Sequence, residues 1–341
     1  MAQIAVIGCG TWGTALARLL CNNGHVVIMW SPFAKEAEAL SRTHIQPNLP
    51  DVVLPESLTF TADMEEAVRA KDLVVMAVAS PFTRSTAVKM APFVEKGQRV
   101  VTVTKGIEDG TLLTQAEILG EIMPDATIGA LSGPTHAEEV IIGLPTAIIS
   151  ASIDREMAEY VQSVFMNPVF RVYTSPDVLG VELGGSLKNV IALAAGMADG
   201  MGYGDNVKAA LITRGIHEIG RLAIRMGAKH QTLQGLSGIG DLIVTCASMH
   251  SRNRRAGILI GQGKGMDEAM REVGQVVEGV YSAKAAIALA KKYDVELPIT
   301  EAVNRILFEG ENPGDVVREL MMRDRKSEDA LSYEDLPEGW R

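Results

Sequence analysis

The sequence has little cysteine and no excess of positive charge. Cys9, Cys21 and Cys246 are scattered along 341 residues without metal-ligand spacing, and an odd count argues against a disulfide framework. We therefore expect no metal site and a reducing compartment, the cytoplasm. The formal net charge of −10 disfavours nucleic acid as a partner, because phosphate backbones need an extended basic surface. Small anions remain compatible with this charge.

Targeting signals and long apolar runs are also missing. No charged residue precedes Arg18, so the basic segment of a secretory signal is not expected at this end. The other charge-free runs are too short or too rich in glycine to cross a bilayer, and we expect no membrane insertion. At 341 residues, the chain exceeds the size at which single hydrophobic cores stop growing. Two domains are therefore expected.

The N-terminal segment has the spacing of a dinucleotide-binding loop. Residues 3–7 are a charge-free run typical of a buried parallel strand, and residues 14–21 indicate a helix that ends near Gly24. Between them, Gly8 permits a tight turn, Gly10 lets the backbone approach a pyrophosphate, and Gly13 lets helix and strand pack closely. The helix start would hold the anion. Three spaced glycines also occur in ordinary turns, but the strand and helix around them favour a dinucleotide site.

Strands and helices alternate through the first half of the chain. Further strands are predicted at residues 26–30, 73–78, 100–104, 128–132, 146–151 and 170–174. This alternation predicts a mostly parallel sheet with helices on both faces, and ligands bind beyond the carboxyl ends of such strands. Lys105 and the turn at residues 133–135 follow two of these ends. Ser80 is predicted to cap a helix, and Thr135 and Glu138 to form a capping box.

Strand signals end near residue 177, and helical spacing predicts helices at 207–226, at 279–294 and from residue 298. The predicted fold class is α/β. A Rossmann-like, doubly wound sheet occupies residues 1–176, an all-helical substrate and catalytic domain follows at 177–322, and a peripheral tail ends the chain at 323–341. Within the helical domain, residues 235–241 are expected to form a glycine-rich loop that presents the carboxylate of Asp241.

Two segments of the second half carry charge in unusual surroundings. Lys188 and Asn189 stand in an apolar, small-residue stretch, where a lowered lysine pKa would suit proton transfer. The alternative is a lysine whose stem reaches the surface. The run Ser251-Arg252-Asn253-Arg254-Arg255 is basic in an acidic protein. It is either a solvated helix start capped by Ser251 or a phosphate site with guanidinium contacts.

These and other motifs resemble the NAD(P)-dependent glycerol-3-phosphate dehydrogenase family of the soluble bacterial kind. The matching segments occur in the expected order along most of the chain, at residues 8–17, 105–108, 132–140, 184–206, 238–242, 251–254 and 277–280. The resemblance implies reversible hydride transfer between NAD(P)H and dihydroxyacetone phosphate. The product, sn-glycerol 3-phosphate, would feed glycerophospholipid synthesis. It also implies a homodimer.

The resemblance assigns roles to individual residues. Lys188 would be the catalytic acid and base, with Asp241 able to orient it. The expected substrate-binding residues are Lys105, Gly133, Thr135, Lys188, Asp241, Ser251, Arg252 and Asn253. The expected cofactor-binding residues are Gly8, Gly10, Thr11, Trp12, Gly13, Lys105, Ala137, Arg252, Val276 and Glu278. Ser186 stands where the family usually has alanine or threonine. His136 and His217 are expected to be structural, and no role is assigned to His25, His44, His230 or His250.

The preference between NAD and NADP is open. After the second strand, Pro32 stands where the family commonly has an arginine for the 2′-phosphate, and no Asp or Glu ends the strand to bind a free ribose 2′-hydroxyl. Lys35 is the nearest cation. We therefore expect weak discrimination, with the two cofactors used within roughly tenfold of each other.

Two other functions fit parts of the sequence. One is a 3-hydroxy-acid dehydrogenase of similar plan, whose substrate would have less use for the basic run at 251–255. The other is a dinucleotide-binding sensor without turnover. Such a sensor would not be expected to retain Lys105, Lys188 and Asp241 together, so this alternative is less favoured.

Overall fold

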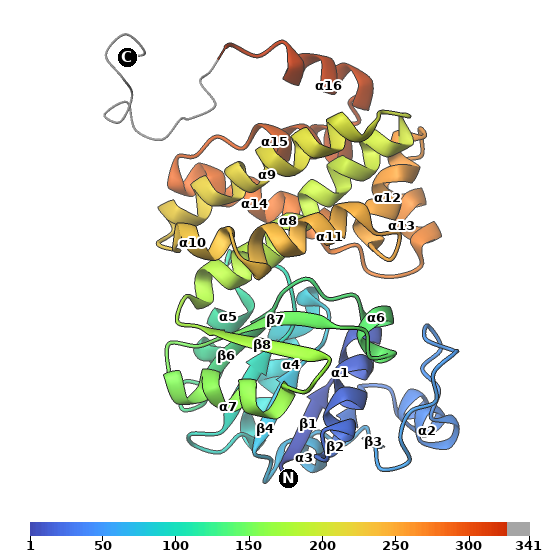
Figure 1. Cartoon of the computed structure of the whole chain (residues 1–341), viewed down its shortest axis with the longest axis vertical. Helices are drawn as coiled ribbons and strands as arrows, with labels where there is room; N and C mark the ends of the chain where they lie inside the picture. Colours follow the sequence, from blue (N-terminus) through green and yellow to red (C-terminus); the bar gives the residue numbers. More distant parts are fainter. Residues whose placement is uncertain (326–341) are drawn as a thin grey trace.

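The computed structural model, which describes residues 1–325, stacks a helical half on a half built around a sheet (Figure 1). The sheet is eight-stranded, in the order β3-β2-β1-β4-β5-β6-β7-β8, and every neighbouring pair is parallel except β6 with β7. The strands are β1 (Gln3–Ile7), β2 (Val26–Trp30), β3 (Thr59–Thr61), β4 (Leu73–Met76), β5 (Arg99–Thr102), β6 (Thr127–Ser132), β7 (Thr146–Ala151) and β8 (Phe170–Ser175).

Helices cover both faces of this sheet because successive strand residues point to opposite sides. In β1, Ile4 and Val6 join one buried cluster, which includes Leu16 of α1, whereas Ala5 and Ile7 join a second cluster. The helices and turns are α1 (Thr11–Asn22), α2 (Ala34–Thr43), α3 (Met64–Val68), η1 (Ser80–Phe82), α4 (Thr83–Met90), η2 (Ala91–Phe93), α5 (Gln115–Ile122), α6 (Ala137–Ile141) and α7 (Arg155–Phe165).

The helical half is organised around α8, and in the described residues no strand follows β8. Its elements are α8 (Val178–Gly200), α9 (Asp205–Arg225), α10 (His230–Leu233), η3 (Leu236–Gly240), α11 (Asp241–Ala247), α12 (Arg252–Gly261), α13 (Met266–Val273), α14 (Glu278–Tyr293), α15 (Pro298–Asn304), η4 (Arg305–Glu309) and α16 (Pro313–Met321). The predicted fold class, a Rossmann-like sheet followed by an all-helical region, is confirmed.

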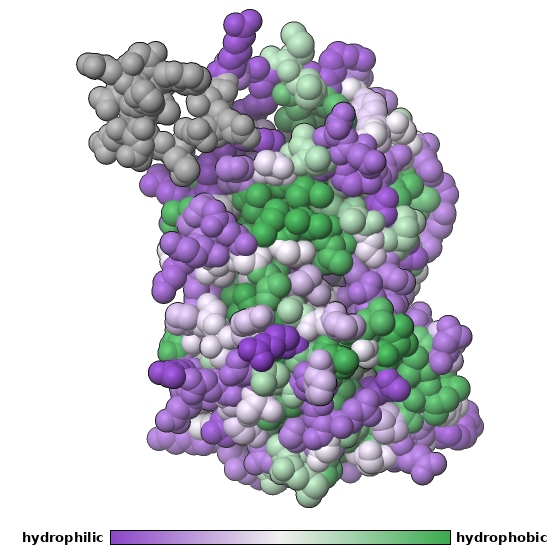
Figure 2. All heavy atoms as spheres, in the orientation of Figure 1, coloured by the Kyte–Doolittle hydropathy of each residue, from purple (hydrophilic) through white to green (hydrophobic). Residues whose placement is uncertain are grey.

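Glycines allow α8 and α12 to pack closely. A Cβ on Gly196 of α8 would lie 2.2 Å from the carbonyl oxygen of Arg254, and one on Gly257 of α12 would lie 2.2 Å from that of Leu193. Only glycine fits at such a crossing. By length and composition α8 could cross a membrane, but 89% of its most apolar window is buried inside the structure. Figure 2 shows a mixed polar surface with an apolar patch on the helical half.

Local sequence predictions need correction at three places. Thr135 caps no helix: its hydroxyl donates to the carbonyl oxygen of Gly133 at 3.1 Å, and α6 begins after His136 without a side-chain cap. Ser80 begins a 3₁₀ turn, and its hydroxyl donates to Glu278 of the helical half instead of capping a helix. Residues 236–240 form a π-helical turn rather than a loop, and Asp241 begins α11. Of the predicted tail, residues 326–341 lie outside the described residues.

Candidate active site

A cavity of about 380 Å³ lies where the carboxyl ends of the central strands meet the helical half. Most of the residues predicted from sequence line it, as expected for a ligand site in an open α/β sheet. From the sheet half these are Gly10, Thr11, Trp12, Lys105, Thr135 and Ala137, and from the helical half Lys188, Ser251, Arg252, Asn253, Val276 and Glu278. The cavity walls therefore combine the predicted substrate-binding and cofactor-binding residues.

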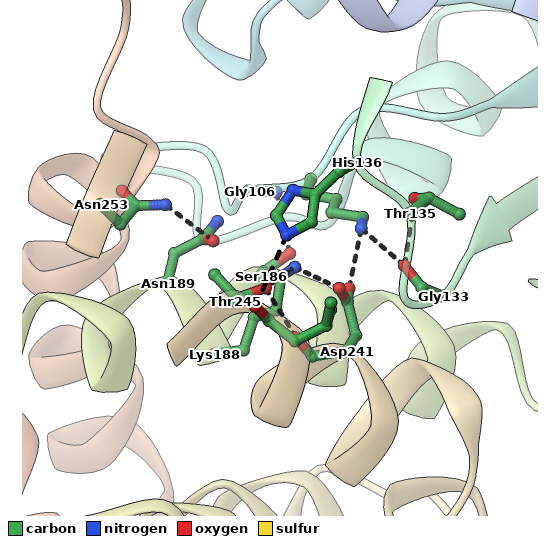
Figure 3. Close-up of polar contacts among 12 residues, drawn as sticks. Gly106, Gly133, Thr135, His136, Ser186, Lys188, Asn189, Asp241, Thr245 and Asn253 are labelled. Atoms are coloured by element: carbon green, nitrogen blue, oxygen red, sulfur yellow. Dashed lines mark hydrogen bonds and ion pairs between the residues drawn. The ribbon is translucent and has the colours of Figure 1, made fainter. Parts of the chain in front are cut away.

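Lys188 is in the middle of α8 and does not reach the surface. Its side chain is 6% exposed, and its Nζ donates to Asp241 Oδ1 and, at 2.6 Å, to Thr245 Oγ1 (Figure 3). Burial lowers its pKa from 10.5 to about 7; the nearby ammonium of Lys105 also lowers it, while the carboxylate of Asp241 opposes both effects. The alternative of a lysine that extends to solvent is therefore wrong. Near neutral pH, this amine can hold or release a proton.

Asp241 holds two lysines with one carboxylate. Oδ1 accepts from Lys188, and Oδ2 accepts from Lys105 Nζ at 2.7 Å. The carboxylate is 1% exposed, and Lys105 also donates to the carbonyl oxygen of Gly133 at 3.0 Å. When Lys188 is protonated, two ammonium groups share one negative charge here, so the cluster then has a net positive charge. An anionic substrate beside it would gain from that charge.

A second polar chain joins α8 to α12 and α14. Asn253 Nδ2 donates to Asn189 Oδ1 at 2.9 Å, and Asn253 Oδ1 accepts from the backbone N–H of Gly279 at 2.8 Å. The side-chain amide of Asn253 therefore uses one of its two donors and one of its two acceptor sites within the protein. Ser186, which replaces a family alanine or threonine, accepts from the N–H of Gly106 at 2.8 Å. Its hydroxyl thus links the two halves beside the cavity.

The glycine-rich loop has the shape that a pyrophosphate needs. A Cβ on Gly8 would lie 2.9 Å from the carbonyl oxygen of Ala77, and one on Gly13 would lie 2.5 Å from that of Gly8, whereas Gly10 faces open space. Helix α1 starts without a side-chain cap and without an acidic residue in its first turn. The N–H groups at its start are thus available to an anion. The residues present fit a dinucleotide cofactor.

The basic run is divided between structural and cavity positions. Ser251 accepts from the N–H of Arg254 at 3.2 Å, so the predicted cap of α12 is confirmed. Arg254 is tied to Asp199 at 2.8 Å. Arg252 and Arg255 line the cavity, and within residues 1–325 neither guanidinium group makes a hydrogen bond or ion pair. They are the guanidinium groups of this run that remain available to a phosphate.

Glu278 connects the helical half to the sheet half. It is 8% exposed and accepts from the hydroxyl and, at 3.4 Å, the N–H of Ser80. Burial raises its pKa, while the bonds from Ser80 and the charge of Arg252 oppose that rise. A predicted cofactor contact is therefore also a hydrogen-bonding link between the halves.

Sequence reasoning missed several residues of the site. Thr245 is one turn after Asp241 on α11 and also accepts from Lys188, so an i, i+4 pattern could have found it. His136 and His250 were given no catalytic role, yet both line the cavity, with ring centroids 5.7 Å apart. Burial lowers the pKa of His136. No sequence signal pointed to the histidines, because their proximity arises only where the turn before α6 meets α11, with His136 Nε2 3.5 Å from the carbonyl oxygen of Val244.

The cavity can therefore hold an anionic small molecule against a titratable amine, next to a cradle for a pyrophosphate. Proton exchange at Lys188 needs a partner atom within hydrogen-bond distance of its Nζ, on the cavity side. Among the described residues, no group of three or more His, Cys, Asp or Glu is placed to hold a metal ion. The site thus offers acid–base and electrostatic chemistry from its own side chains.

Comparison with known proteins gives one consistent result. Models described as the N-terminus and the C-terminus of NAD-dependent glycerol-3-phosphate dehydrogenase match residues 3–158 and 177–318. The chain is 61% identical to the NAD(P)+ glycerol-3-phosphate dehydrogenase of Agathobacter rectalis over 329 residues, which cover 96% of this chain and 98% of that protein. It is 54% identical to the enzyme of that name from Fusobacterium nucleatum, with 96% and 99% covered.

A solved structure agrees with this result. The crystal structure of glycerol-3-phosphate dehydrogenase from Coxiella burnetii superposes with a TM-score of 0.90 at 37% identity, covering 94% of this chain and 99% of that one. The similarity therefore extends over both halves and over the cavity between them.

Proposed function

The chain belongs to the NAD-dependent glycerol-3-phosphate dehydrogenase family, and from that premise we propose that Lys188 exchanges a proton with the C2 oxygen of its substrate. As a member, the protein is an NAD(P)-dependent oxidoreductase that interconverts dihydroxyacetone phosphate and glycerol 3-phosphate. The observation that carries the proposal is the buried, cavity-lining ammonium held by Asp241 and Thr245, with its pKa lowered to about 7.

In the reducing direction, Lys188 donates its proton to the C2 oxygen; in the oxidising direction, its neutral form accepts that proton. A bound reduced nicotinamide supplies the hydride. Asp241 acts through Lys188 as a positioning residue, since it fixes the ammonium at the cavity wall. Lys105, fixed by the same carboxylate, stabilises negative charge on the substrate.

The substrate phosphate binds at the start of α12. Its N-terminus, capped by Ser251, and the unpaired guanidinium of Arg252 attract a dianion. Asn253 holds Asn189 in place beside Lys188. Thr135 lines the cavity, and the carbonyl oxygen of Gly133, which does not line it, accepts from Lys105 and orients that lysine. A 3-hydroxy-acid substrate, which lacks a phosphate, would have less use for the basic run at residues 251–255.

On the cofactor side, the N–H groups at Gly10, Thr11 and Trp12 bind the pyrophosphate, and Gly8 and Gly13 make the tight turn that exposes them. Ala137, Val276 and Glu278 line the neighbouring wall of the same cavity. Together these residues would hold the cofactor in the cavity that Lys188 also lines.

Lys188→Ala tests the proton-transfer role. Loss of general acid–base help lowers kcat by about a hundredfold or more, while the dissociation constant for NADH, measured by fluorescence titration, stays within about twofold. Lys188→Arg is the matched control, because it keeps the charge but cannot release a proton at neutral pH. It should be as inactive as the alanine variant. A kcat near that of the wild type in Lys188→Ala would contradict the assignment.

Other expectations extend the same proposal. The domain division at residues 176 and 177 separates the cofactor half from the substrate half. We further propose a cytoplasmic enzyme whose product enters glycerophospholipid synthesis. It would act as a homodimer that buries the apolar patch on the helical half (Figure 2). Light scattering on the purified protein distinguishes a dimer from a monomer.

A further inference from the structure

A carboxylate stands at the end of β2, where the sequence had indicated none. Trp30 ends this strand opposite Ile7 of β1, and the N–H of Gly8 donates to the carbonyl oxygen of Trp30 at 2.9 Å. The chain that leaves β2 therefore starts beside the glycine-rich loop. In the first turn of α2, Glu36 points back to this position and accepts from the hydroxyl of Ser31.

Glu36 is close enough to the loop to act on it electrostatically. Burial raises the pKa of the Cys9 thiol, and the charge of Glu36 raises it further. Cys9 is the residue between Gly8 and Gly10. Ser31 is fully buried. Glu36 is only half-buried and therefore keeps contact with solvent. In parallel sheets of this kind, an acid near the end of the second strand is placed to meet the ribose of a dinucleotide.

The bond between Ser31 and Glu36 can also be explained as part of a helix start with no role in binding. A similar turn after β3 provides a comparison within the same protein. After β3, Thr61 donates to Glu66, and the N–H of Asp63 donates to Thr61 Oγ1 at 3.0 Å. After β2, the N–H of Phe33 likewise donates to Ser31 Oγ at 3.1 Å. The two turns are the same kind of helix start. The two turns differ in their position relative to the glycine-rich loop, because β3 is the edge strand whereas β2 lies next to β1. Glu66 is therefore a matched control for Glu36.

We propose that Glu36 sets the cofactor preference by accepting a hydrogen bond from the ribose 2′-hydroxyl of NAD(H) and repelling the 2′-phosphate of NADP(H). Pro32 offers no donor to a 2′-phosphate, and the exposed Lys35 is the nearest cation in sequence. A 2′-phosphate at this position is therefore repelled by Glu36, and no bound positive charge offsets the repulsion. Cofactor specificity is the difference between the affinities for NAD(H) and NADP(H). This revises the sequence-based expectation of weak discrimination. The inference rests on the cofactor site proposed above.

The test uses binding as well as turnover. Dissociation constants for NADH and NADPH are measured by fluorescence titration on the wild type, Glu36→Gln and Glu66→Gln, together with kcat/KM for dihydroxyacetone phosphate reduction. We expect the wild type to bind NADH at least about tenfold more tightly, which corresponds to about 1.4 kcal/mol. Glu36→Gln should remove most of this difference by improving NADPH binding. Glu66→Gln should leave it unchanged.

A second measurement needs no variant, so it remains informative if Glu36→Gln fails to fold. Adenosine 5′-monophosphate should compete with NADH more strongly than adenosine 2′,5′-bisphosphate, which carries the additional 2′-phosphate. Tighter binding of the bisphosphate, or an unchanged NADH to NADPH ratio in Glu36→Gln, would overturn the inference and leave Glu36 as a helix cap. Failure of the underlying cofactor site looks different, because then neither dinucleotide binds the wild type.

Discussion

Replacing Asp241 by asparagine should move the pH dependence of the reaction toward acid. The carboxylate accepts from both Lys188 and Lys105, and its charge is what holds the pKa of Lys188 as high as about 7 despite burial. An opposite charge at this range is worth about 1–3 pKa units. With an amide at position 241, two ammonium groups face each other without compensation, so the pKa of Lys188 falls further.

The size of the effect follows from the protonated fraction. At pH 7, about half of the wild-type Lys188 carries the proton, since its pKa lies near that pH. A fall of 1–3 units leaves about 10% to 0.1% protonated, so kcat/KM for dihydroxyacetone phosphate reduction at pH 7 should drop by about 5- to 500-fold. Oxidation of glycerol 3-phosphate uses the neutral amine, and its acid limb should move to lower pH in the variant.

The assay is kcat/KM in both directions between pH 5 and 9, for wild type and Asp241→Asn. The substrate phosphate itself ionises near pH 6, but that ionisation is common to both enzymes and cancels in their comparison. Breaking a buried ion pair costs about 3–5 kcal/mol, so the folded fraction must be measured by denaturation at each pH. An oxidation profile whose midpoint stays in place or moves to higher pH in the variant would refute this account of the site.

The remaining predictions concern the substrate phosphate and the buried glutamate of α8. Arg252→Ala should weaken kcat/KM for dihydroxyacetone phosphate by about tenfold or more and that for unphosphorylated dihydroxyacetone much less; equal losses would mean a structural role. Glu182 is fully buried, and burial raises its pKa to about 7. Between pH 4.5 and 7 the folded state keeps a proton that the unfolded state has released, so the free energy of unfolding falls as pH rises, by at most about 3 kcal/mol. Glu182→Gln should flatten that slope in urea denaturation at pH 5 and 8, and an unchanged slope would show that Glu182 stays ionised.

Local sequence patterns were enough to find the principal residues. The glycine spacing at residues 8–13 between a strand and a helix predicted the cradle, because a side chain at Gly8 or Gly13 would collide with backbone and one at Gly10 would fill the space left for an anion. The isolation of Lys188 in an apolar segment left two possibilities, a perturbed amine or a lysine that reaches the surface, and its burial within α8 selects the first. Ser251 was correctly predicted as a helix cap, because a cap bonds a backbone N–H only three residues away.

Contacts between elements could not be predicted this way. Asp241 accepts from both lysines because the segment after β5, α8 and α11 meet at one point. In the sequence, Asp241 is 136 residues from Lys105 and 53 residues from Lys188. The link from Ser80 to Glu278 spans 198 residues. The hydroxyl of Ser80 was expected to cap a helix, because sequence patterns indicate only partners that are a few residues away.

The sequence alone determined which groups the chain carries: a glycine loop with dinucleotide spacing, a lysine in an apolar segment and a basic run, each recognised from neighbours a few residues away. Only the tertiary structure decided how these groups act together. It placed Glu36 near the glycine loop, left the Arg252 side chain without a partner among residues 1–325, and gave one carboxylate to two lysines. Charge interactions depend on distance and burial, and both are fixed by packing between segments that are far apart in the chain.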